Sequence, residues 1–540
     1  MVERAIKPPK DITLVIQQCK TLNHIKQIHA SLVKRPSFRK PAAVNSLLLF
    51  TATSVNSAFF SYARALFQSL LQRTTFQYNT MIRGHLQSNQ PRDAILCYKD
   101  MLKDGLIRNN YTFTPLVKAC SRVLPELGYM GLLIHANVLK LGFCVDPFIA
   151  SALIEFYALN HDMGTAEELF EEIPVRDVVL WTAMLDGYGI AGDVSRARAL
   201  FDKMPQRNVI SWSAIMAAYS RVSGFKEVLC LYRRMEESGF KPNESVLVSA
   251  LTACANIGAL AQGLWLHSYA MKCRFETNSI LATSLVDMYS KCGCVKLALN
   301  VFEDNHNKDS AAWNAIISGL AANGEGVKSL ELFDDMISSG TRPTEATFVA
   351  VLTACTHAKL LEKGLYLFAS MSKIYKIEPK MEHYACVVDL LARSGKLVEA
   401  EKFIDEKMDG IFVGDKNVWG ALLGACRVYG NVDIGNKLWS KLVKKKGVVD
   451  YGIHVLAYNM YREAGWDAEA KCVRRLIEKK EMKKKPGCSA LEVNGIVEEF
   501  FAGDILHPQA DEMCRILDCL LYNMSCSATL YVCDNETSNL

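Results

Sequence analysis

The chain has 540 residues, half of them hydrophobic, with a formal net charge of +5 and 18 cysteines. This charge is too small for a polybasic surface that would hold nucleic acid or membrane by charge alone. No run of apolar residues is long enough for a bilayer-spanning helix, so no membrane partner is expected. The cysteines are scattered, and recurrent Ala-Cys pairs favour buried free thiols over disulfides at Cys120, Cys254, Cys355 and Cys426.

A helical hairpin of a little over thirty residues recurs along the chain. Residues 178–189 read VVLWTAMLDGYG, and residues 209–220 read VISWSAIMAAYS. Aligned, they place Trp181 over Trp212, with further apolar residues at i+3, i+4 and i+7, which form one face of an α-helix. A turn signal and a second apolar face follow in both copies. Each repeating unit is therefore predicted to consist of two helices.

In chain order, the copies cycle through three lengths, of 35, then 35 to 37, then 31 residues. A first copy begins near residue 8, and a weaker copy covers about 41–74. The later copies cover 75–109, 110–146, 147–177, 178–208, 209–243, 244–278, 279–309, 310–344 and 345–380. This cycle fits neither tetratricopeptide repeats, which keep one period of about 34, nor HEAT or armadillo repeats of about 40 or more.

Hairpins of this kind must stack, because a single one cannot bury both of its apolar faces. The predicted fold is an all-α, right-handed α-solenoid superhelix of stacked helical hairpins, with a concave groove lined by the first helices. Residues on both sides of Asn494-Gly495 alternate in polarity, a strong signal for a β-hairpin with a type I′ turn. We therefore expect a small C-terminal β-hairpin extension, followed by a helix around Ile516 to Met524.

The motifs resemble a plant pentatricopeptide-repeat (PPR) protein of the PLS type, whose P, L and S motifs cycle in that order. The resemblance covers roughly residues 8–524 and rests on YNTMIRG, LTACANIGALAQG, LVDMYSKCG, SWSAIMAAYS and EHYACVVDLLARSGKLVEAEKFI. NVWGALLGACRVYGNVDIG resembles the family's E1 motif, and LAYNMYREAGWDAEAKCVRRL resembles E2. KKPGCSALEVNGIVEEFFAGDILHPQADEM is similar to the E+ extension, which indicates the E/E+ subgroup without a C-terminal DYW deaminase domain.

The resemblance implies five parts. They are a short N-terminal segment at 1–10, considered as a remnant of a targeting sequence, a PPR repeat array at 11–415, E1/E2 motifs at 416–485, an E+ extension at 486–524 and a C-terminal tail at 525–540.

The sequence departs from the family pattern in three places. Arg108 stands where the P motif prefers Pro, Leu124-Pro125 replaces a turn with Gly, and Ala490 stands where the family often has Trp.

The family resemblance implies single-stranded organellar RNA as the ligand, with one nucleotide per repeat read by the fifth and the last residue of a motif. The predicted RNA-binding residues form the pairs Asn79/Asn109, Ser151/Asp177, Thr182/Asn208, Ser213/Asn243, Thr283/Asp309 and Asn314/Thr344. An ionised Asp only accepts hydrogen bonds, which suits guanine and uracil, whereas an Asn amide also donates, which suits adenine and cytosine. The alternative is that these Asp and Asn residues merely cap the next helix.

The family also assigns purines to Ser or Thr at position five and pyrimidines to Asn. From residue 75 onward, the RNA implied is pyrimidine, unread, G, A, A, unread, G, pyrimidine, from 5′ to 3′. The second residue of a motif would sandwich the bases, at Phe148, Val179, Ile210 and Ile280. L motifs carry Val248 and Val349 at position five and receive no base.

Catalysis is not expected of this chain. Zinc deaminases use a His-x-Glu and a Pro-Cys-x-x-Cys motif. None of the 11 histidines has Glu two residues later, and no Cys-x-x-Cys occurs, so neither a metal site nor a cofactor is expected. The E+ resemblance implies selection of sites for organellar C-to-U RNA editing. A DYW-type deaminase protein, together with other editing factors, would then be recruited in trans through the E/E+ region.

Two alternatives remain at this point. An organellar RNA-binding factor for transcript stabilisation, splicing or translation would use the same groove without a deaminase. A protein-binding scaffold of the tetratricopeptide kind is the remote alternative, because it offers no reason for the paired polar positions. On family grounds, the expected location is the mitochondrion, with the chloroplast as the alternative.

Overall fold

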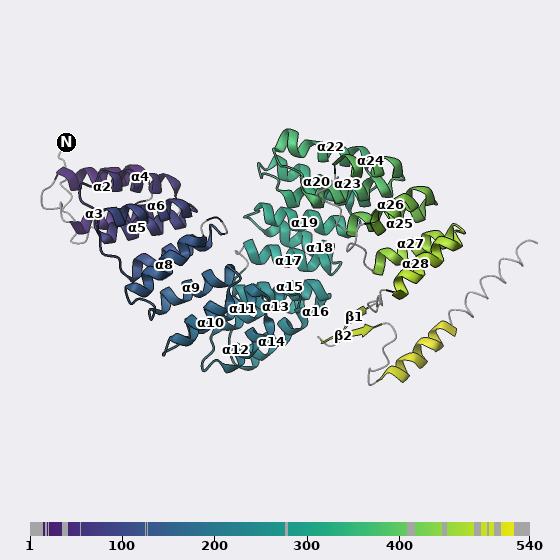
Figure 1. The fold of residues 1–540 in the computed structure, drawn as a ribbon, viewed down its shortest axis with the longest axis horizontal. Coiled ribbons are helices and arrows are strands. Elements are labelled where there is room, and N and C mark those ends of the chain that lie inside the picture. The colour runs from purple at the N-terminus through teal and green to yellow at the C-terminus, as the bar shows by residue number, and fades with distance from the viewer. Residues whose placement is uncertain are drawn as a thin grey trace, which may run out of the picture. The chain divides into compact units, whose positions relative to one another are not determined.

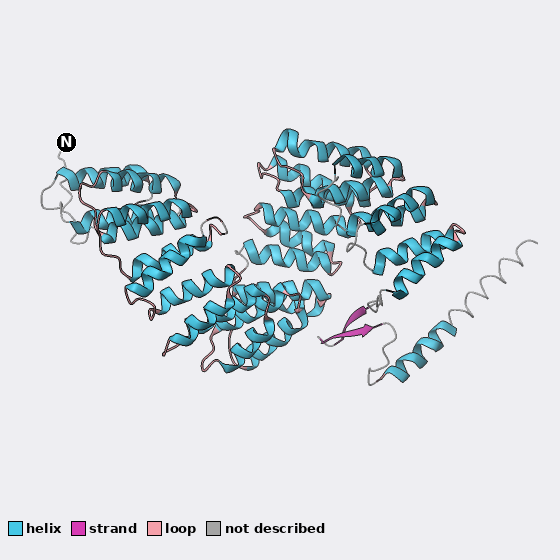
Figure 2. Ribbon diagram, in the orientation of Figure 1, coloured by secondary structure: helices cyan, strands magenta, loops and turns pink. Residues whose placement is uncertain are grey.

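The computed structural model describes residues 15–16, 19, 21–34, 41–54, 56–124, 126, 128–275, 279–407, 416–444, 451–479, 488–493, 496–501 and 509–522. The chain forms two compact units, Met1–Ser249 and Ala250–Leu540. The segment at 1–10 and the tail at 525–540 lie outside the described residues. Figures 1 and 2 show helical hairpins stacked one after another within each unit, with β1 and β2 as the strands that are drawn.

The described helices of unit 1 form consecutive hairpins, and the first helix of each packs on the first helix of the next. They are α2 (Leu22–Lys34), α3 (Pro41–Ala52), α4 (Ser57–Gln68), α5 (Thr75–Gln87), α6 (Pro91–Lys103), α7 (Asn110–Ser121), α8 (Gly128–Lys140), α9 (Pro147–Leu159), α10 (Met163–Glu172), α11 (Val178–Ala191), α12 (Val194–Lys203), α13 (Val209–Arg221) and α14 (Phe225–Glu237). The division between the units falls within α15 (Glu244–Ile257), a boundary that the repeat pattern did not indicate.

Unit 2 continues the same arrangement. Its helices are α16 (Leu260–Lys272), α17 (Ser279–Lys291), α18 (Val295–Asp304), α19 (Ser310–Ala322), α20 (Gly326–Ser338), α21 (Glu345–His357), α22 (Leu361–Ser370), the π-helix η2 (Met371–Tyr375), α23 (Met381–Arg393), α24 (Leu397–Lys407), α25 (Lys416–Val428), α26 (Val432–Lys444), α27 (Tyr451–Glu463) and α28 (Asp467–Lys479). The hairpins α25–α26 and α27–α28 lie in the region that resembles E1 and E2. The predicted all-α solenoid is confirmed.

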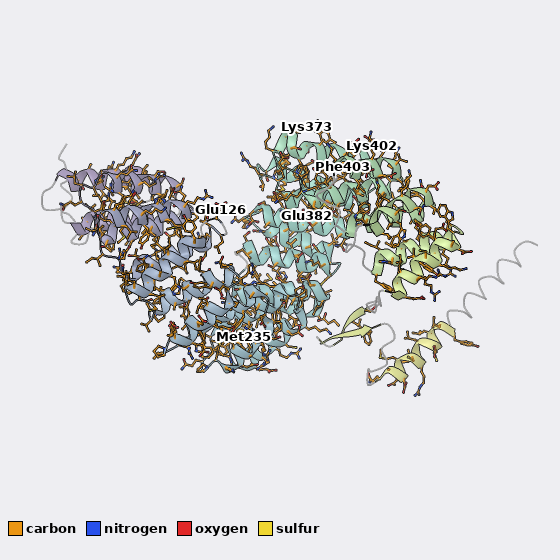
Figure 3. The ribbon with its side chains drawn as sticks, in the orientation of Figure 1. Glu126, Met235, Lys373, Glu382, Lys402 and Phe403 are labelled. Atoms are coloured by element: carbon orange, nitrogen blue, oxygen red, sulfur yellow. The ribbon has the colours of Figure 1, made fainter. Side chains whose placement is uncertain are left out.

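Burial follows the two apolar faces of the repeat. On α13, Trp212 and Ile215 are at most 2% exposed, and on α14 Leu231 and Met235 are fully buried. Met235 is labelled in Figure 3, which draws the side chains on the ribbon. Because every hairpin buries one face internally and another against its neighbour, the core extends along each unit instead of gathering at one centre.

The Ala-Cys cysteines are part of this core. Cys120, Cys254, Cys355 and Cys426 are fully buried and free, as predicted. Burial raises the pKa of Cys120 and Cys254 to about 12 and that of Cys355 and Cys426 to about 11. Such thiols stay protonated, so they act as small apolar side chains.

The β-hairpin lies where the sequence predicts it. β1 (Cys488–Val493) pairs antiparallel with β2 (Ile496–Phe501), and Val493 faces Ile496 across a two-residue connection at 494–495. Those two residues, and with them the turn type, lie outside the described part of the chain. A helix follows at 510–522.

Glu492 of β1 contacts a helix far away in the sequence. Its Oε2 accepts a hydrogen bond from Ala261 N at 2.8 Å, and its Oε1 accepts one from Gln262 N at 3.0 Å. These amides belong to the first turn of α16, whose own N-cap residue, Ala259, provides no side-chain hydrogen bond. The strand therefore supplies the cap that the helix lacks.

Candidate nucleic-acid interface

The first helices of unit 1 line a groove. It consists of two depressions of about 810 and 480 Å³, lined by α3, α5, α7, α9, α11 and α13 together with the residues that precede these helices. Thr114, Lys118 and Phe148 line both depressions, so the two are parts of one groove. Five of the predicted RNA-binding residues of unit 1 border it: Asn79, Asn109, Ser151, Thr182 and Asn208. In unit 1 the first helices therefore line the groove, as predicted.

We use the term reading pair for the fifth and the last residue of one motif. The last residue of a pair precedes the next first helix and, except at Asn109, its side chain caps that helix. Asp177 Oδ1 accepts a hydrogen bond from Leu180 N at 2.9 Å, and Asn208 Oδ1 accepts one from Ser211 N at 2.9 Å. The same arrangement holds at Asn243, which caps through Val246 N, and at Asp309, which caps through Ala312 N. Helix capping, the alternative explanation for these residues, is therefore present.

Capping occupies only one of the two polar atoms of these side chains. Oδ2 of Asp177 and of Asp309 has no hydrogen-bond partner among the described residues, and the same holds for Nδ2 of Asn208 and of Asn243. An unpartnered carboxylate oxygen accepts hydrogen bonds, whereas an unpartnered amide nitrogen donates them. The two kinds of cap therefore present opposite hydrogen-bonding groups, and capping does not exclude base recognition.

The fifth residues with hydroxyl groups lie one turn inside the first helix. Ser151 Oγ donates to Pro147 O at 2.7 Å, Thr182 Oγ1 to Val178 O at 2.7 Å and Thr283 Oγ1 to Ser279 O at 2.9 Å. Each bond fixes the hydroxyl proton on the helix and leaves the oxygen as an acceptor. Ser213 differs, since its Oγ lies 2.7 Å from Ser245 Oγ of the following helix.

Asparagine at position five is bonded to its own partner residue. Asn79 Nδ2 donates to Asn109 Oδ1 at 2.9 Å, and Asn79 Oδ1 accepts from Thr112 Oγ1 at 2.8 Å. In unit 2, Asn314 Nδ2 donates to Thr344 Oγ1 at 3.0 Å, and Asn314 Oδ1 accepts from Thr347 Oγ1 at 2.5 Å. We call these two closed pairs, because their members are bonded to each other, and the remaining four open pairs.

The second residue of the motifs exposes apolar surface beside the pairs. The exposed fractions are 67% for Phe148, 51% for Val179, 62% for Ile210 and 67% for Ile280. Two further side chains at the same position were missed by the sequence reasoning: Phe76 is 46% and Tyr111 74% exposed, and both line the groove. Their position in the motif was the signal that could have identified them. The groove of unit 1 thus carries an apolar side chain at every repeat from 75 to 210.

A reading pair also exists in the motif at 110–146, to which no base was assigned. Its fifth and last residues, Thr114 and Asp146, both line the groove. Asp146 Oδ1 caps α9 by accepting from Phe148 N, but Asp146 Oδ2 accepts from Asn110 Nδ2 at 3.1 Å. The atom that stays unpartnered in Asp177 is therefore occupied in Asp146.

The charge lining the groove changes along its length. Position nine of the successive first helices carries Arg83, Lys118, Glu155 and Asp186. Arg83 and Lys118 are exposed and form no ion pair with a described residue. Burial raises the pKa of Asp186, an effect that nearby Arg221 opposes and Glu155 reinforces. The groove therefore offers unpaired cations at the repeats 75–146.

Other kinds of site are not found in the described residues. No three His, Cys, Asp or Glu side chains there group closely enough to hold a metal ion. Within the same residues, no helix has the length and apolar character needed to cross a membrane.

Stacked helical hairpins define a helical-repeat protein of the α-solenoid class. Residues 73–122 and 308–357 match the model described as PPR repeat family, and residues 179–209, 210–240 and 280–304 match the model described as PPR repeat. Pentatricopeptide repeat-containing protein At5g66520 of Arabidopsis thaliana is 42% identical over 504 residues, which is 92% of this chain and 79% of that protein. The chain belongs to the pentatricopeptide repeat family.

Two more relatives and one solved structure are informative. Pentatricopeptide repeat-containing protein ELI1, chloroplastic, of Arabidopsis thaliana is 39% identical, over 95% of this chain and 80% of the relative. Protein At2g22410, mitochondrial, of the same plant is 33% identical, over 97% and 91%. The crystal structure of PPR10 in complex with an 18-nt psaJ RNA element has a TM-score of 0.59 and 16% identity, covering 88% of this chain and 74% of that chain. This likeness concerns the fold.

Proposed function

We propose that the chain is a sequence-specific single-stranded RNA-binding protein of plant organelles. The observation that carries this proposal is the regular alternation, along the groove of unit 1, of polar reading pairs with exposed apolar side chains. Unstacked bases are recognised by contacts to their faces together with hydrogen bonds to their edges. The exposed rings of Phe76, Tyr111 and Phe148 can contact the faces of bases. The unpartnered atoms of Asp177 and Asn208 can form hydrogen bonds to base edges.

The unpaired cations support the same proposal. Phosphate contacts supply much of the affinity in nucleic-acid complexes, and they need cations that no carboxylate already neutralises. Arg83 and Lys118, which line the larger depression, meet this condition. The likeness in fold to PPR10, whose solved complex holds an RNA element, supports the assignment further.

A direct test uses a synthetic RNA of the order U-N-G-A-A-N-G-U, where N is an equimolar mixture of bases and uridine stands at the pyrimidine positions. We expect the purified protein to bind this RNA more tightly than the same bases in permuted order. Equal binding of both RNAs at fixed salt would contradict the proposal.

Within this function, we propose that the RNA sites are chosen for C-to-U editing and that the E/E+ region recruits a deaminase in trans. The support is the set of motifs at 417–513 and the absence of His-x-Glu and Cys-x-x-Cys from the sequence. One relative is named chloroplastic and another mitochondrial. We propose that this protein acts in the mitochondrion, with the chloroplast as the alternative.

Sequencing of mitochondrial and plastid cDNA from plants in which the gene is disrupted tests this finer proposal. Loss of editing at one or a few cytidines is the expected result. Intact editing with altered transcript abundance would instead indicate a role in stabilisation, splicing or translation. Deletion of residues 486–540 should leave RNA affinity nearly unchanged while editing fails, and a comparable loss of RNA affinity would contradict the recruitment role.

A further inference from the structure

Among the described residues, a cation, a phenylalanine and a second aromatic ring recur together at four places. The guanidinium of Arg176 lies 4.8 Å from the centre of the Phe170 ring, and this ring meets the Trp181 ring edge to face at 5.1 Å. We call such a set a column. The other columns are Arg73–Phe67–Tyr78, Arg207–Phe201–Trp212 and Lys308–Phe302–Trp313, with cation-to-ring distances of 4.8, 5.0 and 5.2 Å.

The cation of a column also ends the preceding helix. Arg176 Nε donates to Phe170 O at 2.8 Å, and its Nη2 donates to Glu171 O at 2.9 Å. Arg207 repeats this fork, donating to Phe201 O at 3.1 Å and to Asp202 O at 3.0 Å. Carbonyls in the last turn of a helix have no partner within the helix, so the two arginines satisfy them. Lys308 forms only one such bond, to Glu303 O at 3.1 Å.

The 35-residue hairpins end their second helices differently. After α6, α14 and α20 the chain turns through Gly105, Gly239 and Gly340, whose φ angles are 69°, 80° and 79°. These left-handed glycines let backbone amides cap the helix. The hairpins at 147–177 and 178–208 have no glycine at the corresponding place and are four residues shorter, and the arginine fork replaces the glycine turn.

In each column, the cation and the second aromatic residue each directly precede a reading residue in the sequence. Asp177 follows Arg176, and Thr182 follows Trp181. Likewise Asn208 follows Arg207, and Ser213 follows Trp212. One column therefore joins the last residue of one pair to the fifth residue of the next pair, and these two residues belong to neighbouring nucleotides in the proposed complex.

We propose that Arg176 and Arg207 are positioning residues for base recognition. Each holds the segment that carries the last residue of its own motif and, through the phenylalanine, the helix that carries the fifth residue of the next motif. Their guanidinium groups do not line the groove, so this influence acts through the reading residues and not through contact with RNA. The inference rests on the proposed RNA-binding function.

The test uses the RNA U-N-G-A-A-N-G-U and its variants with each base in turn at the third, fourth and fifth positions. Asp177 and Ser151 are assigned to the third nucleotide, Thr182 and Asn208 to the fourth, and Ser213 and Asn243 to the fifth. Arg207→Met should lower discrimination at the fourth and fifth nucleotides by about tenfold, the scale of one charge-assisted hydrogen bond. Arg176→Met should act at the third and fourth nucleotides instead. Discrimination at the seventh nucleotide should stay unchanged in both variants.

Two further variants keep the test decisive. Arg207→Lys copies the arrangement found at Lys308, so it should fold and lose less discrimination than Arg207→Met. Arg196→Met removes a cation from the same hairpin α11–α12. Arg196 binds Glu167 at the surface and contacts neither a column nor the groove, so base discrimination should stay at the parent value.

The outcomes separate this inference from the proposed function. Suppose that the parent protein discriminates between bases and that the Arg176 and Arg207 variants discriminate between them to the same degree as the parent. The columns then do not position the reading residues. A uniform loss of affinity at every nucleotide, with unchanged ranking, would show a merely structural role and would also overturn the inference. If the parent protein does not distinguish bases at all, the proposed function fails, and this inference fails with it.

Discussion

The hairpins at 147–208 and the hairpin at 75–109 present their reading residues in different states. In the first region, the pairs are open: Ser151 and Thr182 bond to their own helices, while Asp177 and Asn208 keep one unpartnered atom each. In the second region, Asn79 is bonded to Asn109 and to Thr112. In the proposed complex, a base would therefore meet unpartnered groups in one region and, in the other, a pair whose members are already bonded to each other.

This difference matters for recognition, because an internal hydrogen bond must be lost or shared when a base takes its place. An open pair can recognise a base edge without this cost. A closed pair leaves fewer groups available, so we expect it to discriminate between bases more weakly in the proposed complex. The family resemblance assigns Asn79 and Asn314 to pyrimidines in general and not to one base, and their closed state is the feature that the tests below change.

The largest effect is expected from changing the unpartnered atom of an open pair. Asn208→Asp retains the cap on α13 but replaces the amide donor by a carboxylate, so preference at the fourth nucleotide should change from A toward G. The expected size is roughly 1–3 kcal/mol. Binding of RNAs that differ only at this base, at one fixed salt concentration, measures it. Gln206→Glu makes the same chemical change two residues earlier and serves as the control. If both proteins rank the four bases alike, Asn208 acts only as a cap.

Opening a closed pair should have the next largest effect. Asn314→Ser removes the bond to Thr344 and leaves a hydroxyl like that of Thr283, so preference at the eighth nucleotide should change from pyrimidine toward purine by about 1–2 kcal/mol. The same substitution at Asn79 should act on the first nucleotide alone. Competition binding with uridine or adenosine at each end measures both changes. An effect of either variant at the opposite end would contradict independent reading.

The pair at 110–146 allows a third test, in which an occupied atom is released. Asn110→Ala removes the amide that occupies Asp146 Oδ2, and Asp146 then resembles Asp177. The second nucleotide, unread in the parent, should gain a preference for G of about 1 kcal/mol. Asn137→Ala, on α8, removes an amide that bonds only to Leu133 O and should leave the ranking unchanged. Continued indifference to the second base would show that release of Oδ2 is not sufficient.

The smallest effect concerns the contact that holds an open-pair hairpin to its predecessor. His135 Nδ1 lies 2.7 Å from Tyr157 Oη, and burial lowers the pKa of His135 below 6.5 while Glu172 opposes this shift. Because the folded state favours neutral His135, its contribution to stability is complete above pH 6.5 and is lost as the pH falls through the lowered pKa.

The melting temperature should therefore decrease as the solution is acidified below pH 6.5. His135→Gln should reduce this dependence by an amount on the order of one degree. Thermal melts of the parent and variant at a series of pH values measure the difference. Identical pH profiles of both proteins would contradict the assignment.

The sequence predicts the repeats well because each hairpin is local. Trp212, Ile215 and Met216, spaced i, i+3 and i+4, show the helical period directly, and Asn494-Gly495 predicts the hairpin turn. The reading residues follow from their place in the motif and the family resemblance. The bond between Asn79 and Asn109 and the contact of Asn110 with Asp146 could not be predicted, because each depends on the distance between a helix residue and the residue that precedes another helix. The arginine fork could not be predicted for the same reason, because a basic residue before the cap does not by itself indicate bonds to the carbonyls of the preceding helix.

The hydrogen bonds of Glu492 to α16 have a consequence for the order of folding. Repeat contacts join residues a few tens of positions apart, so hairpins can form and add to one another locally. Glu492 and Ala261 are separated by 231 positions, and closing so long a loop costs chain entropy that local contacts do not. This contact should therefore form after the hairpins between them are in place and be the first to be lost on unfolding. An amide-exchange measurement would find Ala261 and Gln262 less protected than the interior of α16.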